Sequence, residues 1–256
     1  MAEKRPLTAL DEIESGLVWV NKFGAAASGI QTTVTDVWDR ADATPTQQIW
    51  LAPTAARLHA IVSTSASDAA GGVGMRTVTV YGLPDWDSSE IQETVTLNGT
   101  SSVNTVNSFV IIHRMRAETW GATNVNVGTI TATAATDSTV TAAILPGNGQ
   151  TLMAIYGVPS TETWYVTNYY ASINKAQGAA ATISFRLSVN PSPDVLTTRY
   201  LVKHVIGTQS TGANHFAHQF NPYFALAGPA ILKLQGIASA ADADATGGFD
   251  AIKTRT

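Results

Sequence analysis

The stretch MRTVTVYGLPDWDSSEIQETVTLNGTSSVNTVNSFVIIHRM (75–115) decides the fold class. It contains three runs rich in Val, Ile, Thr, Tyr and Phe, at 76–82, 92–98 and 107–114, and clusters of Gly, Pro, Asp, Asn and Ser separate them. β-Branched and aromatic residues favour strands, whereas the separating residues favour turns. The stretch therefore predicts antiparallel strands joined by turns.

The first two runs alternate between apolar and polar side chains. In the first run Val78 and Val80 alternate with threonines, and the second run repeats the pattern. Successive side chains of a strand point to opposite faces, so this pattern is typical of a sheet with one buried and one solvated face. Asn98 and Gly99 end the second run with a pair that tolerates the positive φ of a tight turn.

Similar runs occur along most of the chain. They lie at 30–38, 55–63, 128–135, 138–144, 150–158, 163–173, 182–189, 199–207 and 230–238. Turn signals separate them about every ten residues, and no long amphipathic helix lies between them. We therefore expect an all-β chain built as antiparallel β-sandwiches or jelly rolls, with one or two tandem sandwiches. The tryptophans Trp38 and Trp50 are expected to fill the core.

The first residues of the chain differ from the rest. Thr8 is a candidate N-cap, and Leu10, Ile13 and Leu17 fall on one side of a helix. An isolated helix of this length is marginal in water. We expect either an arm that docks on a neighbouring subunit or partner, or a helix packed on the chain's own sheet, or a frayed terminus.

The rest of the chain forms two rough halves without an exact repeat. The turn-forming sequence Pro-Gly-Asn-Gly at 146–149 is the best place for a division between them. The predicted organisation is an N-terminal arm at 1–24, a first sandwich at 25–148 and a second sandwich at 149–256.

Charged residues are scarce. They make up 13% of the chain, about half the usual share of roughly 25%, and Lys and Arg are absent from 117–174. Short polar side chains lose little entropy on ordering and leave few charges to desolvate, so this surface suits subunit contacts. The alternative interpretation is a neutral β-domain of the extracellular type.

Composition also argues against several classes of protein. The net charge of −4 and the lack of a basic cluster argue against a dedicated nucleic-acid-binding protein. With no cysteine, neither disulfides nor Cys-based zinc sites can form. The first twenty residues carry four acidic side chains, which predicts no secretory signal, and no apolar run has the length of about 20 residues that spans a membrane.

Two groups of side chains are weak candidates for a metal site. His215 and His218 are three residues apart, a spacing that metal-binding helices use, but no carboxylate lies near them in the sequence and aromatic residues surround them. Asp242 and Asp244 imitate the opening of a calcium loop, yet Lys253 stands where the bidentate Glu is required. We expect the histidines to pack against aromatic rings and the aspartates to form a turn, with no metal bound.

Catalytic motifs are absent from the sequence. There is no Gly-x-Ser-x-Gly elbow and no Gly-rich phosphate loop, and Ser, His and Asp fall into no convincing set. We therefore expect no catalytic residue, no cofactor and no enzymatic activity.

Four segments together resemble a family of virion proteins of tailed bacteriophages, of the type common in marine phages. They are STSASDAAGGVGMRTVTVYGL (63–83), ETVTLNGT (93–100), GNGQTLMAIYGVP (147–159) and GGFDAI (247–252). The resemblance implies a non-enzymatic, β-rich component of a virus particle, made in the host cytoplasm and located in the virion.

Three functional hypotheses follow. The first is a capsid decoration or cement protein, a homotrimer or other homo-oligomer that bridges capsomers and has the major capsid protein or other virion proteins as partners, with no nucleic acid and no membrane. The second is a tail, collar or baseplate component that contacts the host receptor. The third is a carbohydrate-binding or carbohydrate-degrading module, for which Trp86, Trp120 and Trp164 are candidate exposed aromatics.

Overall fold

A computed structural model of the 256-residue chain describes residues 17–40, 47–175, 182–210 and 214–254. These residues form antiparallel β-sheets, which confirms the predicted all-β fold class. The strands are β1 (Leu17–Ile30), β2 (Thr35–Asp36), β3 (His59–Ser63), β4 (Met75–Leu83), β5 (Ile91–Thr96), β6 (Val103–Asn104), β7 (Ile111–Trp120), β8 (Ile130–Ala134), β9 (Val140–Ile144), β10 (Ile155–Val158), β11 (Thr163–Lys175), β12 (Thr182–Asn190), β13 (Leu201–Gln209), β14 (His215–Ala227), β15 (Ala230–Ala238) and β16 (Ala243–Thr254). The described residues contain no helix with the length and hydrophobicity of a membrane span.

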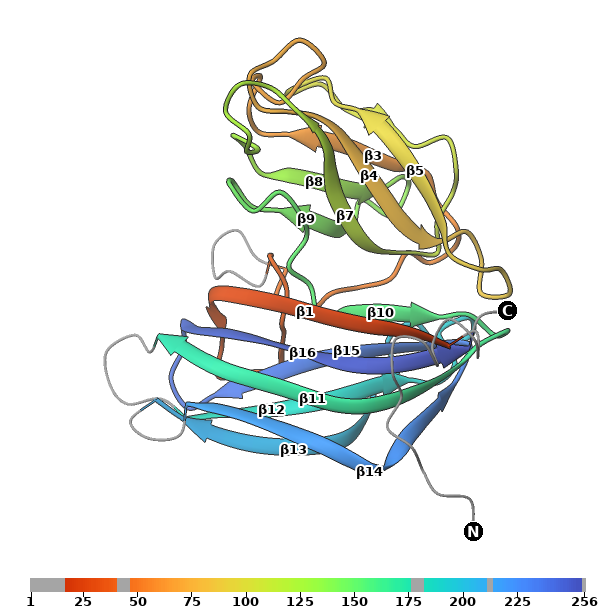
Figure 1. Ribbon diagram of the computed structural model, residues 1–256, viewed down its shortest axis with the longest axis vertical. Helices are drawn as coiled ribbons and strands as arrows, with labels where there is room; N and C mark the ends of the chain where they lie inside the picture. Colours follow the sequence, from red (N-terminus) through yellow and green to blue (C-terminus); the bar gives the residue numbers. More distant parts are fainter. Residues whose placement is uncertain (1–16, 41–46, 176–181, 211–213, 255–256) are drawn as a thin grey trace.

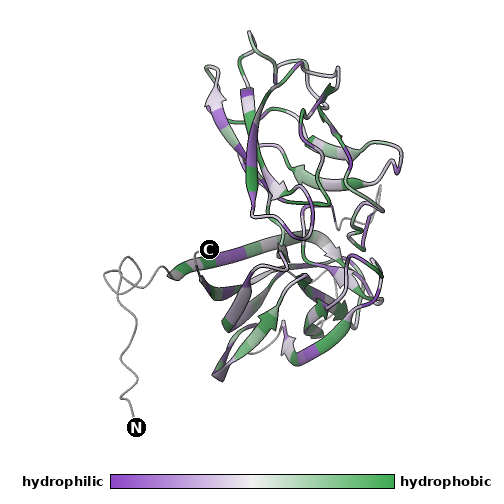
Figure 2. Cartoon of the chain, turned by 90° about the vertical axis from the view of Figure 1, so that its right-hand side faces the viewer, coloured by the Kyte–Doolittle hydropathy of each residue, from purple (hydrophilic) through white to green (hydrophobic). Residues whose placement is uncertain are grey.

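The sheets stack in two pairs, so the described chain contains two β-sandwiches (Figure 1). In the larger sandwich a sheet of order β1-β16-β11-β14 lies against a sheet of order β10-β15-β12-β13, to which β2 adds beside β15. In the smaller sandwich β6-β3-β8-β9 lies against β5-β4-β7. Figures 1 and 2 show the smaller sandwich standing on one side of the larger one.

The smaller sandwich is inserted into the larger one. The described part of the chain starts with β1 and β2 of the larger sandwich, crosses over to build β3–β9, and returns for β10–β16. The boundary predicted after residue 148 falls between β9 and β10, where the chain returns. The predicted first sandwich at 25–148 is too long at its start. The end of β1 and all of β2 fall within that range, but they pair with β16 and β15 of the larger sandwich.

Residues 17–24 form the first part of β1 and not an arm or helix. Leu17 pairs with Thr254, and the ladder continues along β16 to Ala26 opposite Ala245. The helical pattern was misleading here because the partner strand is more than 200 residues away, where no local sequence signal reveals it. Leu10 and Ile13 lie outside the described residues.

The turn expected for Asp242 and Asp244 is found at Asp242 but not at Asp244. Asp242 has a positive φ of 61°, but from Ala243 the chain forms β16, which pairs with β1 on one side and β11 on the other. The glycines are needed for close packing: a Cβ on Gly248 would lie 2.1 Å from the Lys22 carbonyl oxygen, and one on Gly247 would lie 2.6 Å from the Tyr170 carbonyl oxygen. The neighbouring strands therefore leave no room for side chains at these two positions.

A buried ion pair fixes β2 to the larger sandwich. Lys233 Nζ lies 2.8 Å from Asp36 Oδ2, and both side chains are almost completely inaccessible to solvent. Asp36 also accepts hydrogen bonds from Gln235 Nε2 and from the Trp50 backbone N–H, at 2.8 and 2.7 Å. The attraction between two buried charges offsets the cost of removing them from water only where hydrogen bonds also satisfy both groups.

Trp50 connects the two sandwiches at the crossing. Its backbone is bound to Asp36 in the larger sandwich, and its indole N–H donates to the Thr141 carbonyl oxygen of β9 at 2.8 Å. Trp50 and Trp38 are fully buried, as predicted. The crossing segment is thus fixed to both sandwiches by one large side chain.

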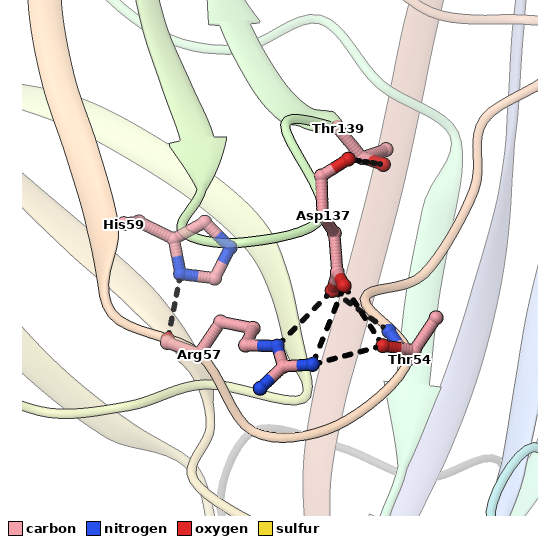
Figure 3. Close-up of polar contacts among 5 residues, drawn as sticks. All are labelled: Thr54, Arg57, His59, Asp137 and Thr139. Atoms are coloured by element: carbon pink, nitrogen blue, oxygen red, sulfur yellow. Dashed lines mark hydrogen bonds and ion pairs between the residues drawn. The ribbon is translucent and has the colours of Figure 1, made fainter.

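A second polar cluster holds the crossing segment against the turn between β8 and β9 (Figure 3). The Asp137 carboxylate accepts from Arg57 Nε at 3.3 Å and from the backbone N–H and hydroxyl of Thr54 at 3.0 and 2.8 Å. His59 Nδ1 lies 3.0 Å from the Arg57 carbonyl oxygen, and burial lowers the pKa of His59 to about 4. The neutral imidazole therefore donates to this carbonyl at pH 7.

Replacement of Asp36 tests the importance of the buried ion pair. Asp36→Ala should lower the free energy of unfolding by about 3–5 kcal/mol, because it leaves the Lys233 ammonium buried without a counter-charge. Urea denaturation monitored by tryptophan fluorescence measures this loss. Asp194→Ala, at an exposed position, is the matched control and should change stability by no more than about 0.5 kcal/mol. Equal unfolding midpoints for the two variants would show that the ion pair between Asp36 and Lys233 does not contribute to stability.

Candidate functional site

A polar cluster lies where the two sandwiches meet. Lys22 comes from β1 and Tyr156 from β10 of the larger sandwich, whereas His113 comes from β7 and Glu90 immediately precedes β5 of the smaller one. These four residues are called the junction cluster below. A cavity of about 320 Å³ opens beside them.

Hydrogen bonds join the members of the junction cluster across the interface. His113 Nε2 lies 2.6 Å from Glu90 Oε2, and the Tyr156 hydroxyl donates to the same oxygen. The His113 and Tyr156 rings stack with centroids 3.7 Å apart and an angle of 19° between planes. Lys22 Nζ donates to the His113 carbonyl oxygen. Every member thus bonds or stacks with a residue of the other sandwich.

Burial controls the protonation of these groups. Burial, together with the nearby Arg114 charge, lowers the pKa of Lys22 to about 7. Burial also lowers the pKa of His113 and raises the pKa of the neighbouring Asp39 to about 8. Burial acts to raise the pKa of Glu90, but the charge and hydrogen bonds of His113, with the Tyr156 hydroxyl, outweigh it and lower that pKa.

Perturbed pKa values of this kind are frequent in active sites and in structural ion-pair networks. Here the donors and acceptors engage one another: His113 and Tyr156 converge on one Glu90 oxygen, and Lys22 is directed to a backbone carbonyl. The arrangement favours a role in joining the two sandwiches over a role in attacking a substrate.

The depressed pKa of Lys22 predicts a specific pH dependence of stability. The unfolded chain keeps the ordinary lysine pKa of roughly 10.4, so between pH 8 and 10 it binds a proton at Lys22 that the folded chain lacks. The free energy of unfolding should therefore rise with pH, by about 2 kcal/mol over this range. In Lys22→Met this contribution should be absent. Urea denaturation at pH 8, 9 and 10 measures both profiles.

Lys203→Met is the control for this experiment because Lys203 is exposed. It should keep the rise in stability of the parent chain. If Lys22→Met kept the same slope as the parent, the buried ammonium would not be the group that titrates.

The histidines proposed as weak metal candidates are not brought together. His215 and His218 lie on opposite faces of β14, because a spacing of three that places residues on one side of a helix separates them on a strand. His218 instead stacks on His204 of β13, with centroids 4.0 Å apart, and packs against Tyr169 and Phe220. The predicted packing of the histidines against aromatic rings is thus confirmed for His218.

The two aspartates are likewise separate from any cluster of ligands. Asp242 Oδ1 accepts a hydrogen bond from Gln31 Nε2 at 2.9 Å, and Asp244 lies in β16. Within the described residues, no three His, Cys, Asp or Glu side chains gather as a metal site would require.

The aromatic side chains exposed to solvent differ from those suggested by the sequence. Trp164 is fully buried, and its indole N–H donates to Glu162 Oε2 at 2.7 Å. Trp86 and Trp120 are partly buried against the core. Among the described residues, the large exposed aromatics are Trp19, Phe23, Tyr165 and Tyr223, with 44%, 41%, 38% and 54% of their surface accessible. Alternation in the sequence LVWVNKF (17–23) is the signal that would have indicated an outward-facing Trp19.

A strip of exposed apolar side chains follows β13, and sequence reasoning missed it. β13 pairs with β12 along one edge. Its exposed apolar residues and those of the preceding turn, called the β13 strip below, are Val195, Leu196, Leu201, Val202 and Val205. Their signal in the sequence is the lack of strict alternation in LVKHV (201–205).

Comparisons of the chain with protein-family models, with curated proteins and with solved structures found no match.

Proposed function

We propose that the chain is a non-enzymatic structural subunit of a bacteriophage particle, a capsid decoration protein that binds the shell or a second copy of itself through the β13 strip. The main support for this proposal is the long apolar edge of β13. The sequence resemblance to phage virion proteins supports a bacteriophage as the particle.

Exposed sheet edges usually carry features that prevent association. Natural proteins protect them with charges, prolines, bulges or covering segments. From Leu201 to Gln209, β13 has one charged residue, Lys203, and no proline. An edge with unpaired backbone groups and apolar side chains is suited to bind another chain. Few charges have to be desolvated when this strip becomes buried.

The composition of the chain fits this mode of binding. A decoration protein holds a shell through the area that it buries and through mass action of many copies. Short polar side chains and a low content of charge reduce the cost of burying large areas. A tail, collar or baseplate location fits the same surface and is the alternative.

Copy number separates these two locations. Symmetry provides an icosahedral shell with on the order of hundreds of equivalent sites, but a tail axis with about six to thirty. Quantitative mass spectrometry of purified virions, relative to the major capsid protein, gives this number. Hundreds of copies are expected for a decoration protein, a few copies would place the chain in the tail, and absence from the particle would overturn the proposal.

A charge placed in the β13 strip should prevent attachment. Val205→Lys should weaken binding of the purified chain to particles that lack it by at least about tenfold, because an ammonium would be buried at the contact. Val73→Lys in the smaller sandwich is the matched control, since Val205 and Val73 are both 50% exposed. Thermal unfolding should be similar for the two variants. Equal binding of both variants would show that the β13 strip is not the contact.

The arm hypothesis for Leu10 and Ile13 is tested by removing residues 2–16 only. Leu17 and the residues after it belong to β1, so a longer deletion would disrupt the larger sandwich. We expect unchanged thermal unfolding and weaker attachment to the particle. Unchanged occupancy of the particle would refute the arm hypothesis.

A further inference from the structure

The outer face of the sheet β1-β16-β11-β14 carries an ordered set of side chains. Along one row across the strands, the ladder register aligns Asn21, Asp250, Asn168 and Gln219. This polar row is flanked on one side by Trp19 and Tyr165 and on the other by Phe23 and Tyr170, which occupy the next outward positions of their strands. The face thus presents amide and carboxylate groups between two aromatic rows.

A bulge in β14 turns one part of this face into a groove. Val166 pairs with Phe224 and Asn168 with Gln219, so the four residues from Phe220 to Tyr223 stand opposite the single residue Thr167. Pro222 has no N–H for the ladder, which explains why the strand leaves its partner here. Figure 1 shows β14 bending sharply within its length.

The groove has the size of a small-ligand site. Its volume is about 500 Å³, and Trp19 and Tyr223 are among the residues that line it, together with Asn168, Gln219 and Asp250. Sites for small molecules typically measure roughly 300–1,000 Å³ and combine aromatic surface with a few polar groups. This groove has both components, and its lining comes from all four strands of the sheet.

Asn168, one of the residues that line the groove, has a polar atom without a partner. Asn168 Oδ1 is buried and makes no hydrogen bond. A buried acceptor without a donor costs about 1–3 kcal/mol, so a rotation of the Asn168 amide that brought Oδ1 to a ligand hydroxyl would gain that hydrogen bond. Asp250 supplies a carboxylate acceptor nearby, and its position is fixed by the hydrogen bond from Asn21 Nδ2.

The charge of the groove limits which kinds of ligand it can bind. Among the described residues, Asp250 is the only charged one in the lining, so these residues offer no cation to a phosphate, sulfate or carboxylate group. Lys22 and Arg114 line a neighbouring cavity at the sandwich junction. A ligand of this groove should therefore be neutral, rich in hydroxyl donors and able to place an apolar face on aromatic rings.

We propose that the groove between Trp19 and Tyr223 binds a neutral oligosaccharide. A pyranose ring has hydroxyl groups at its edge and C–H groups on its face. The C–H face would stack on the Trp19 indole and the Tyr223 phenol ring, whose π faces carry partial negative charge. The hydroxyls would donate to the Asp250 carboxylate and, after rotation of the amide, to Asn168 Oδ1. The proposal is independent of the decoration role, because the β13 strip lies on the other sheet of the sandwich.

The experiment uses the full chain and a broad array of immobilised neutral glycans that includes maltooligosaccharides and cellooligosaccharides, with sulfated heparin fragments beside them. We expect binding to one class of neutral glycan. Isothermal titration calorimetry with that glycan should then show about tenfold or greater loss of affinity for Trp19→Ala and for Tyr223→Ala.

Phe23→Ala is the matched control. Phe23 lies on the same face of β1, is 41% exposed against 44% for Trp19, and does not line the groove. It should retain the affinity of the parent, and thermal unfolding should verify that all three variants are folded. Binding to no neutral glycan, binding to sulfated fragments alone, or equal losses for Phe23→Ala and Trp19→Ala would each overturn the proposal.

Discussion

The antiparallel pairing of β1 with β16 is the constraint on which the rest of the structure depends. It joins the first described residues of the chain to the last ones, so that the larger sandwich is completed by segments on both sides of the inserted smaller sandwich in the sequence. The same register sets Trp19, Asn21 and Phe23 on the outer face and directs Lys22 towards the smaller sandwich. Because side chains alternate along a strand, a shift of one residue would exchange these two sets. Both the groove and the junction cluster thus depend on one ladder.

The contact between the sandwiches relies strongly on buried polar groups. Trp50 connects Asp36 in one sandwich with β9 in the other, and the junction cluster joins β1 and β10 to β7 and the residue before β5. Polar groups away from water require particular partners and directions, which apolar contacts do not. Such contacts favour a defined arrangement of the two sandwiches at the cost of desolvating Lys22 and His113.

The two proposed binding surfaces lie on different sheets of the larger sandwich. The β13 strip belongs to one sheet and is suited to another protein chain, whereas the groove belongs to the outer face of the opposite sheet. A subunit attached to a particle through β13 would leave the aromatic and amide side chains of the groove facing solvent. A particle displaying many copies would then bind a glycan surface with an avidity greater than that of one groove.

The alternating Val and Thr residues of the 76–82 run and the spacing of the turn residues determined, by themselves, that the protein is all-β, because strand periodicity and turn chemistry are local properties. The local sequence pattern did not predict the strands β1, β14 and β16. Their residues pair with strands far away in the sequence, and Gly247 and Gly248 allow close packing between strands. The sites were decided only by the tertiary structure: Trp19, Asn168, Asp250 and Tyr223 come from four strands, and only the ladder register and the β14 bulge bring them into one groove.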